Sequence, residues 1–335
     1  MILPGPSAED TSSSAARPDG PGSDPDPGAG PARRGSARTV GLAVGGALLA
    51  LLVALFGAGV AARGTGELRI PAAGVTTALR AVVFVALALH LGELAGVRLA
   101  RSGAVPRSLA SAAALTGAAG AAGQIVLLAG VSGLDITDVY GTVEGRLLLV
   151  MANGFLLAAG CVALDRPRLA VFPLAVVVGA EALRAHPEPY TPMLGAALTV
   201  VHLSAAALWC GGLLHVLRTM WLRRADPPGA RAVLARYARL AGRLLAALVA
   251  TGTVSTLRRL PVDTVLTTAY GRVLIAKLLL VAVAAGLALA ARGRLRAART
   301  DPTAPAHVEL AVLALVLLLS AILTVVPDPH WLSTR

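Results

Sequence analysis

The sequence predicts an all-α protein that crosses a membrane many times, and its composition and apolar runs lead to this prediction. Of its 335 residues, 56% are hydrophobic and only 14% are charged, whereas the surface of a soluble domain needs more charge. Continuous apolar runs of about 20 residues recur along the chain, which is the length a helix needs to cross a bilayer. Outer-membrane barrels are excluded, because their strands alternate in short segments. We therefore expect a polytopic bundle of about nine transmembrane helices.

The apolar runs also define the domain organisation. The expected spans are 40–62, 73–97, 108–131, 147–164, 169–185, 192–217, 240–260, 272–291 and 308–326. Residues 1–39 are rich in Pro, Gly, Ser and Asp, and we predict a disordered cytoplasmic tail there. This tail does not resemble a signal peptide, because no basic stretch precedes a short apolar core with a cleavage site.

The distribution of arginine predicts the orientation. With the N-terminus inside and the C-terminus outside, 20 of the 29 arginines fall in inner segments. Those segments are 1–39, 98–107, 165–168, 218–243 and 292–307. This asymmetry is typical of the positive-inside pattern. The formal net charge of +12 therefore indicates topology and contact with anionic membrane lipid, and we expect no nucleic acid as a partner.

The sixth apolar segment, 191–217, carries His202, Trp209, Cys210 and His215. Such side chains at bilayer depth normally face a partner, a cavity or a ligand. Helical spacing places Trp209 on nearly the same face as His202, whereas Cys210 is turned away by about 80° and lies ~12 Å deeper. His202 and Cys210 therefore cannot bind one ion, but they can be successive positions on a path. His215 is expected near the inner interface, extending toward water.

Other polar side chains lie inside predicted spans. Glu93 follows His90 by three residues, so it either orients a metal-binding imidazole or forms a plain structural pair with it. Lys277, the only lysine, extends outward to water, pairs with an acid or lines a water-filled cavity. Gln124 and Asn153 lie at a depth similar to that of Lys277. Together with His202 they suggest an outward-facing polar vestibule.

Three further candidate metal ligands are expected on the outer face. These are His186, Met193 and His330, although His and Met are also ordinary surface residues. Both cysteines, Cys161 and Cys210, fall inside spans, so a disulfide framework is not expected. The chain has no CxxC, HExxH, Walker A or GxSxG motif, and we expect no enzyme activity.

Three stretches resemble the copper resistance D (CopD-type) membrane protein family. HLSAAALWCGGL at 202–213 resembles its His-x-x-x-Ala-x-x-Trp-x-Gly-Gly-Leu helix, and 234–251 resembles its Arg-x-x-x-Leu…Thr-Gly segment. TTAYGRVLIAKLLLV at 267–281 resembles its Thr-x-Tyr-Gly-Arg-x-Leu-x-x-Lys signature. The signature residues are Tyr270, Gly271, Arg272 and Lys277. On this resemblance, 40–190 holds the first five helices and 191–335 the CopD-like region with helices 6–9.

The resemblance implies copper transport, namely uptake or handling linked to copper resistance, in a bacterial cytoplasmic membrane. It implies eight family-like helices plus one N-terminal addition. It also implies a periplasmic or extracellular copper-binding protein as partner. Cu(I) suits thiolate, thioether and imidazole ligands, which are the candidates named above.

Two alternatives remain open from the residues. Paired intramembrane histidines can ligate haem, so His90 and His202 would suit a haem-binding redox protein or membrane enzyme. The chain can also be a non-transporting accessory or sensor subunit, in which the basic inner loop at 218–243 would matter most.

Overall fold

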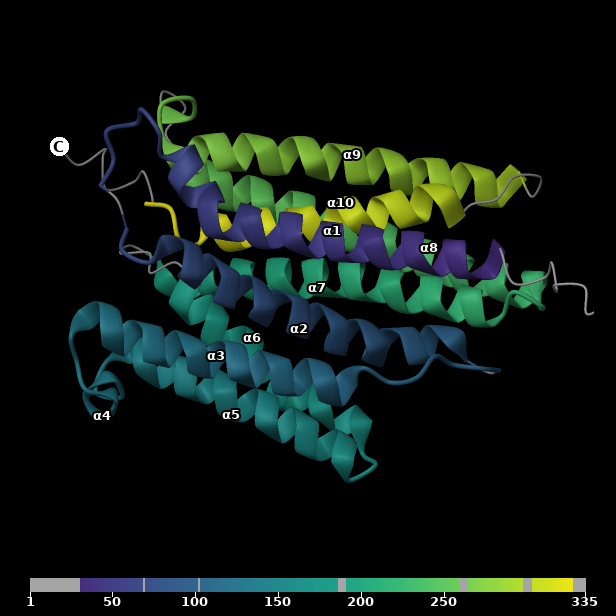
Figure 1. Ribbon diagram of the computed structural model, residues 1–335, viewed down its shortest axis with the longest axis horizontal. Coiled ribbons are helices and arrows are strands. Elements are labelled where there is room, and N and C mark those ends of the chain that lie inside the picture. Colours follow the sequence, from purple (N-terminus) through teal and green to yellow (C-terminus); the bar gives the residue numbers. More distant parts are fainter. Residues whose placement is uncertain are drawn as a thin grey trace, which may run out of the picture. The chain divides into compact units, whose positions relative to one another are not determined.

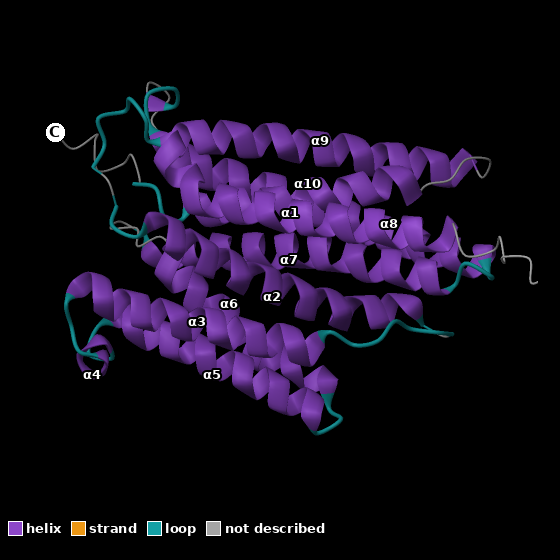
Figure 2. Cartoon of the chain, in the orientation of Figure 1, coloured by secondary structure: helices purple, strands orange, loops and turns teal. Residues whose placement is uncertain are grey.

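The computed structural model describes residues 31–68, 70–101, 103–185, 191–259, 264–297 and 303–327. Within these ranges the chain consists of helices joined by loops, and it has no strand (Figure 2). The chain divides into two compact units, Met1–Ala47 and Leu48–Arg335. All contacts given below lie within the second unit.

The helices follow the predicted apolar segments closely (Figure 1). They are α1 Pro31–Ala61, α2 Ala73–Ala100, α3 Ala110–Ser132, α4 Ile136–Val139, α5 Val143–Ala163, the 3-10 helix η1 Pro167–Ala170, α6 Val171–Ala185, α7 Pro192–Leu222, α8 Pro227–Arg259, α9 Ala269–Ala297 and α10 Thr303–Leu323. Among the described residues, eight helices are long and apolar enough to cross a membrane. The protein is therefore a multi-pass membrane protein, as predicted.

The fifth predicted span differs from the other eight. It corresponds to α6, which has only 15 residues and directly continues η1. At about 1.5 Å per residue such a helix is shorter than the hydrocarbon core of a bilayer. The prediction of nine spans therefore rests on α6, whereas the other eight helices meet the length of a span.

Two expectations about irregular segments are wrong. Residues 31–39 belong to α1 rather than to a disordered tail, while 1–30 lie outside the described residues. The predicted inner loop at 218–243 is mostly helical, because α7 continues to Leu222 and α8 begins at Pro227. The charged residues on either side of the short turn at 223–226 interrupt the apolar pattern but remain in α7 and α8.

The turn between α7 and α8 is set by its own sequence. Asp226 precedes Pro227, and its Oδ1 accepts a hydrogen bond from the backbone N–H of Gly229 at 3.1 Å. An Asp at this position satisfies a backbone donor at the start of a helix, and Pro is tolerated in the first turn. The turn therefore returns the chain antiparallel to α7, so that α8 packs along it.

The parallel helices α2 and α7 approach each other through glycine. A methyl group at Gly211 would overlap the carbonyl oxygen of Ala88, and one at Gly92 would overlap the backbone of Gly211. Small residues of this kind allow helix backbones to pack closely in membranes. This contact joins the α2, α3, α5 and α6 core to the core formed by α7, α8 and α10.

Candidate functional site

Two neighbouring cavities lie among α7, α8, α9 and α10. The first has a volume of about 130 Å³ and the second about 280 Å³. Their shared lining residues are His202, Ala206, Gly252, Thr256, Leu274, Lys277, Leu317 and Ser320. His202 and Lys277 are thus the polar side chains at the junction that can carry a charge.

The His202 ring is held by a hydrogen bond across to α8. Its Nδ1 lies 2.9 Å from Oγ1 of Thr251, whose hydroxyl donates to the carbonyl of Ala247 at 2.7 Å. Since a hydroxyl has one hydrogen, we assign the tautomer in which the Thr251 hydroxyl donates to Ala247 and His202 donates its Nδ1–H to Thr251. Its Nε2 therefore carries the lone pair, which is the form of imidazole that binds a metal ion.

Lys277 lines both cavities and is half-buried. Within the described part of the chain it forms no ion pair with an acidic side chain. Of the possibilities raised by the sequence, lining a cavity is the one that the structure supports.

Glu181 provides a carboxylate at the edge of the first cavity. It is 1% exposed, and its Oε2 accepts from Nε and Nη2 of Arg184, each at 3.1 Å. Its Oε1 has no hydrogen-bond partner among the described residues. The first cavity therefore joins an incompletely bonded carboxylate of α6 to the histidine of α7 and the lysine of α9.

Arg184 belongs to a polar network that links α2, α3, α5 and α6 and reaches the turn after α10. Its guanidinium donates to Glu144 at 3.1 Å and to Oε1 of Gln124 at 2.7 Å. Arg80 lies 3.9 Å from Glu144 and donates to the carbonyl of Thr324 at 2.8 Å. Gln124 is thus part of this network rather than of the cavity lining.

The network was missed at the sequence level because Arg80 and Arg184 fall near the predicted ends of spans. They were counted only as outer arginines that bear on orientation, and Glu181 was not considered. Burial of Arg80, Glu181 and Arg184 inside apolar helices was the available signal, since charges at such depth are normally paired or functional.

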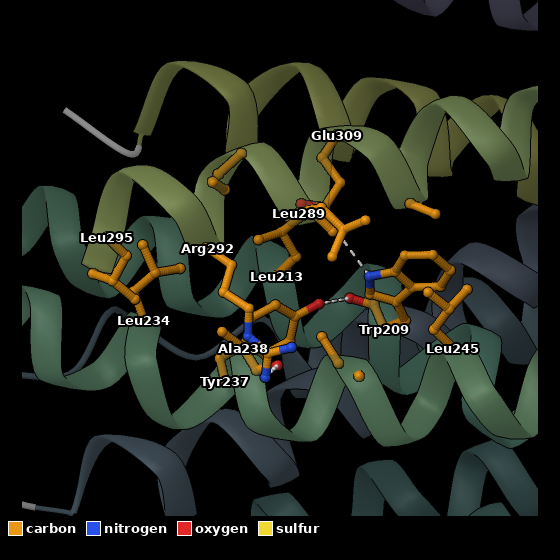
Figure 3. Close-up of a pocket in the computed structure, with 16 residues that line it drawn as sticks. Trp209, Leu213, Leu234, Tyr237, Ala238, Leu245, Leu289, Arg292, Leu295 and Glu309 are labelled. Atoms are coloured by element: carbon orange, nitrogen blue, oxygen red, sulfur yellow. Dashed lines mark hydrogen bonds between the residues drawn. The ribbon is translucent and has the colours of Figure 1, made fainter. Parts of the chain in front are cut away.

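Trp209 separates the second cavity from a third one of about 250 Å³, shown in Figure 3. Its indole Nε1 donates to Oε1 of Glu309 at 2.9 Å, and its carbonyl accepts from the Tyr237 hydroxyl at 2.6 Å. Arg292 lines the far part of this cavity. Glu309, which is 3% exposed, is a further buried carboxylate that the sequence patterns did not single out.

Cys210 lines the second cavity together with His202 and Trp209. Two turns of α7 separate the imidazole from the thiol, as the spacing predicts. Among the described residues, no three His, Cys, Asp or Glu side chains lie close enough together to hold a metal ion. His202 and Cys210 are therefore separate positions along one cavity rather than one ligand set.

His90 and Glu93 do not satisfy each other. Both ring nitrogens of His90 are buried without a hydrogen-bond partner in the described structure, whereas Glu93 Oε2 accepts the backbone N–H of Leu109 at 2.8 Å. His215 does not extend to water either. It is 3% exposed, and its ring packs against Gly96 of α2.

The remaining candidates are scattered. Asn153 is exposed and donates to Leu149 of its own helix at 2.9 Å, so it does not line the vestibule that the sequence suggested. Met193 is 75% exposed at the start of α7. His186 and His330 lie outside the described residues.

The family-like signature at the start of α9 has clear structural roles. A methyl group at Gly271 would overlap the carbonyl of Val265, so the close approach requires glycine. Arg272 donates to the carbonyls of Ala61 at 3.2 Å and Arg63 at 2.7 Å, which fastens α9 to the end of α1. The buried Tyr270 lines the first cavity, and Lys277 lies about two turns further along α9.

The fold defines a multi-pass helical membrane protein with cavities among its carboxy-terminal helices, two of which are lined by His202 and Lys277. The family model described as copper resistance protein D (CopD) matches residues 231–326, which comprise most of α8, all of α9 and α10. Two of the three stretches that resemble the family lie within these residues, while 202–213 precedes them. The comparisons with curated proteins and with solved structures found no match. The matched region associates this membrane protein with copper resistance.

Proposed function

We propose that this protein moves copper ions across a bacterial cytoplasmic membrane through the cavities that meet at His202. The observation that carries the proposal is the orientation of His202. Thr251 engages its Nδ1, and the ring lines two cavities whose other lining residues include several from the CopD-matched helices α8, α9 and α10. An imidazole held in this way presents its Nε2 to a passing metal ion.

The chemistry of the path suits Cu(I). Imidazole nitrogen and cysteine sulfur are ligands that Cu(I) prefers, and His202 and Cys210 line the same cavity. Conduction requires binding that is weak enough at each position for the ion to leave. Single ligands at successive depths meet this requirement better than a closed site of three or four ligands would.

The positive charge of Lys277 would affect the passage of Cu⁺ through the cavities. Arg80, Arg184, Glu144 and Glu181 balance one another, so Lys277 is the additional cation at the cavity junction. A cation at this position repels Cu⁺ unless a carboxylate compensates it. Glu181 lines the same cavity, and its Oε1 keeps an unused acceptor position there, although the charge of this carboxylate is already matched by Arg184.

The proposal includes an orientation and a source of copper. The arginine distribution places the N-terminus inside, which puts Met193 and the start of α7 on the outer face. A periplasmic or extracellular copper-binding protein would deliver the ion there. His186, Met193 and His330 are the proposed points of first contact, followed by His202 and Cys210.

Copper content of cells tests the proposal. Cells that produce the wild-type protein are compared with cells that produce His202→Ala, at matched amounts in the membrane. Higher copper with wild type than with His202→Ala supports uptake through His202, and lower copper with wild type supports export through the same site. The control is His307→Ala, because His307 is exposed on α10 and bonds only its own helix at Thr303.

A second comparison tests whether the proposed path continues from His202 to Cys210. Cys210→Ser is expected to slow Cu(I) uptake into proteoliposomes, whereas Cys161→Ser is expected to leave it unchanged. Cys161 is the matched control because it is half-buried on α5 and lines neither cavity at His202. Equal rates for wild type, His202→Ala and Cys210→Ser would refute transport by this route and favour an accessory or sensor role.

Haem binding, the alternative function, would require two histidines at one site. His90 and His202 would have to face one cavity, but His90 does not line either cavity at His202. The α2 backbone also touches α7 at Gly92 and Gly211, close to His90. A Soret band in the purified protein that is lost in His90→Ala would establish haem binding despite this geometry.

A further inference from the structure

A basin rich in arginine lies where α2, α3, α5 and η1 meet, away from the copper path. Its volume is about 980 Å³, and four arginines line it: Arg98, Arg101, Arg166 and Arg168. Arg98 is near the end of α2, Arg166 lies between α5 and η1, and Arg168 lies within η1. The end of α2 and the segment after α5 therefore each contribute two arginines to the lining of one basin.

The four guanidinium groups have free bonding capacity. Within the described residues, none of them forms a hydrogen bond or ion pair, whereas the buried arginines of the network described above do. Each guanidinium presents several N–H donors in a fixed plane that matches the oxygens of a phosphate group. The basin thus offers many unused donors to an anionic ligand.

The acids in the basin do not cancel these charges. Glu93 and Asp165 line it with the four arginines, which leaves an excess of positive charge. The Glu93 carboxylate is already engaged, because it accepts the backbone N–H of Leu109 at the start of α3. Asp165 is therefore the one carboxylate of the lining without a bond from a described residue.

The backbone is strained where it enters the basin. Arg101 has φ 55° and Asp165 has φ 56°, and they are two of the three non-glycine residues with positive φ in the described structure. Such conformations cost on the order of 1–3 kcal/mol each and concentrate at binding and functional sites. Both residues line the same basin, so the strain is local to it.

Apolar side chains form the rest of the lining. Leu94, Val97, Val162 and Leu169 lie among the arginines, and Val97 and Leu169 are 48% and 43% exposed. A free phosphate would leave this apolar surface without a partner. A phospholipid would cover it with an acyl chain while its phosphate met the guanidinium groups, since basic pockets between transmembrane helices suit anionic headgroups.

We propose that this basin binds the phosphate-bearing headgroup of an anionic phospholipid. The charge, the unused donors and the adjoining apolar surface each match one part of such a lipid. The site is independent of copper, because none of its lining residues lines the cavities at His202.

Retention of lipid by the purified full-length protein tests the proposal. Protein in detergent is incubated with phosphatidylglycerol or with phosphatidylcholine, and bound lipid is counted by native mass spectrometry. We expect the wild type to retain phosphatidylglycerol in preference. The double variant Arg166→Gln/Arg168→Gln should lower that retention at least about tenfold, as should Arg98→Gln/Arg101→Gln.

The control removes the same charge outside the basin. Arg231 and Arg239 are exposed on α8 and do not line the basin, so Arg231→Gln/Arg239→Gln should retain lipid like the wild type. Thermal unfolding of all variants verifies that they are folded. Equal loss of lipid in the control and the basin variants would overturn the proposal, because charge alone would then explain binding.

A competition experiment distinguishes the two sources of a phosphate group. Inorganic phosphate at millimolar concentration is added to the lipid-loaded protein. Continued retention of phosphatidylglycerol supports a lipid site. Displacement of the lipid by phosphate, with the same loss of affinity in Arg166→Gln/Arg168→Gln, would identify a site for free phosphate instead and overturn the lipid assignment.

Discussion

The imidazole Nδ1 of His202 on α7 lies 2.9 Å from the hydroxyl oxygen of Thr251 on α8. In the assigned tautomer, the Thr251 hydroxyl donates its hydrogen to the carbonyl of Ala247, so the Nδ1–H of His202 donates to Thr251 and Nε2 remains free. The position at which copper would bind is therefore set by a residue on a neighbouring helix. Under the proposed function, Thr251 is a positioning residue that acts through His202 and does not itself bind copper.

Replacing Thr251 tests this relationship. Thr251→Val removes the acceptor for the Nδ1–H of His202 while keeping the shape of the side chain. We expect copper affinity to fall by about 10–100-fold, as for other groups that orient a metal ligand. Thr251→Ser keeps the hydroxyl and should bind like the wild type. Competition with a chromophoric Cu(I) chelator measures both, and weak binding by the serine variant as well would show that packing rather than the hydrogen bond matters.

Arg184 on α6 bonds the buried Glu181 of its own helix, Gln124 of α3 and Glu144 of α5. Arg184→Gln leaves Glu181 without its charged partner in the interior, and we expect a loss of stability of about 3–5 kcal/mol. The thermal unfolding midpoint in detergent provides the measurement. Arg184→Gln/Glu181→Gln should be more stable than the single variant, because both buried charges are then absent.

An exposed arginine on α5 serves as the matched control for Arg184. Arg146 bonds only backbone carbonyls near the start of its own helix, so Arg146→Gln should change stability by less than about 0.5 kcal/mol. Similar effects at Arg146 and Arg184 would contradict the structural role assigned to the network.

The hydrogen bond between Trp209 and Glu309 closes the wall between two cavities. Glu309→Leu leaves the buried indole N–H without an acceptor, which costs about 1–3 kcal/mol. Glu309→Gln keeps an acceptor oxygen and should lose much less. Unfolding midpoints, with tryptophan fluorescence as a local readout, compare the two, and equal losses would mean that the charge of Glu309 matters more than its hydrogen bond.

The contact between α2 and α7 depends on the absence of side chains at Gly92 and Gly211. Gly211→Ala would push its methyl group into the carbonyl of Ala88, and we expect a loss of about 1–3 kcal/mol from the displaced helix. Gly286→Ala on α9 is the control, because no heavy atom lies within 4 Å of an added methyl group there. A stable Gly211→Ala variant would show that the two helices can separate without cost.

The helices could be predicted from sequence because an apolar run of about 20 residues matches the thickness of the hydrocarbon core and must be helical to satisfy its backbone hydrogen bonds there. The bounds of α2, α3 and α7 follow the predicted spans within a few residues at most ends. The prediction failed at 218–243, where helix continues through arginine-rich sequence. Charge ends the part of a helix that suits lipid, but it does not break the backbone hydrogen bonds that make the helix.

The polar residues that line the cavities could be predicted only in part. His202, Lys277, Trp209 and Cys210 were found because polar or sulfur-bearing side chains in an apolar run are conspicuous. Glu181 was missed because the sequence gives depth along a helix and not the direction a side chain faces. Asn153 shows the opposite error, since its depth was suitable but its side chain bonds its own helix.

The sequence by itself determined that the chain is a multi-pass helical membrane protein and that its last three helices resemble the copper resistance family. Both follow from local properties, namely the length of apolar runs and a signature contained in one segment. The tertiary structure alone decided that His202 is oriented by Thr251, that Glu181 and Lys277 share its cavity, and that four arginines line a basin elsewhere. These groups come from separate helices, and only the packing of those helices determines which side chains meet.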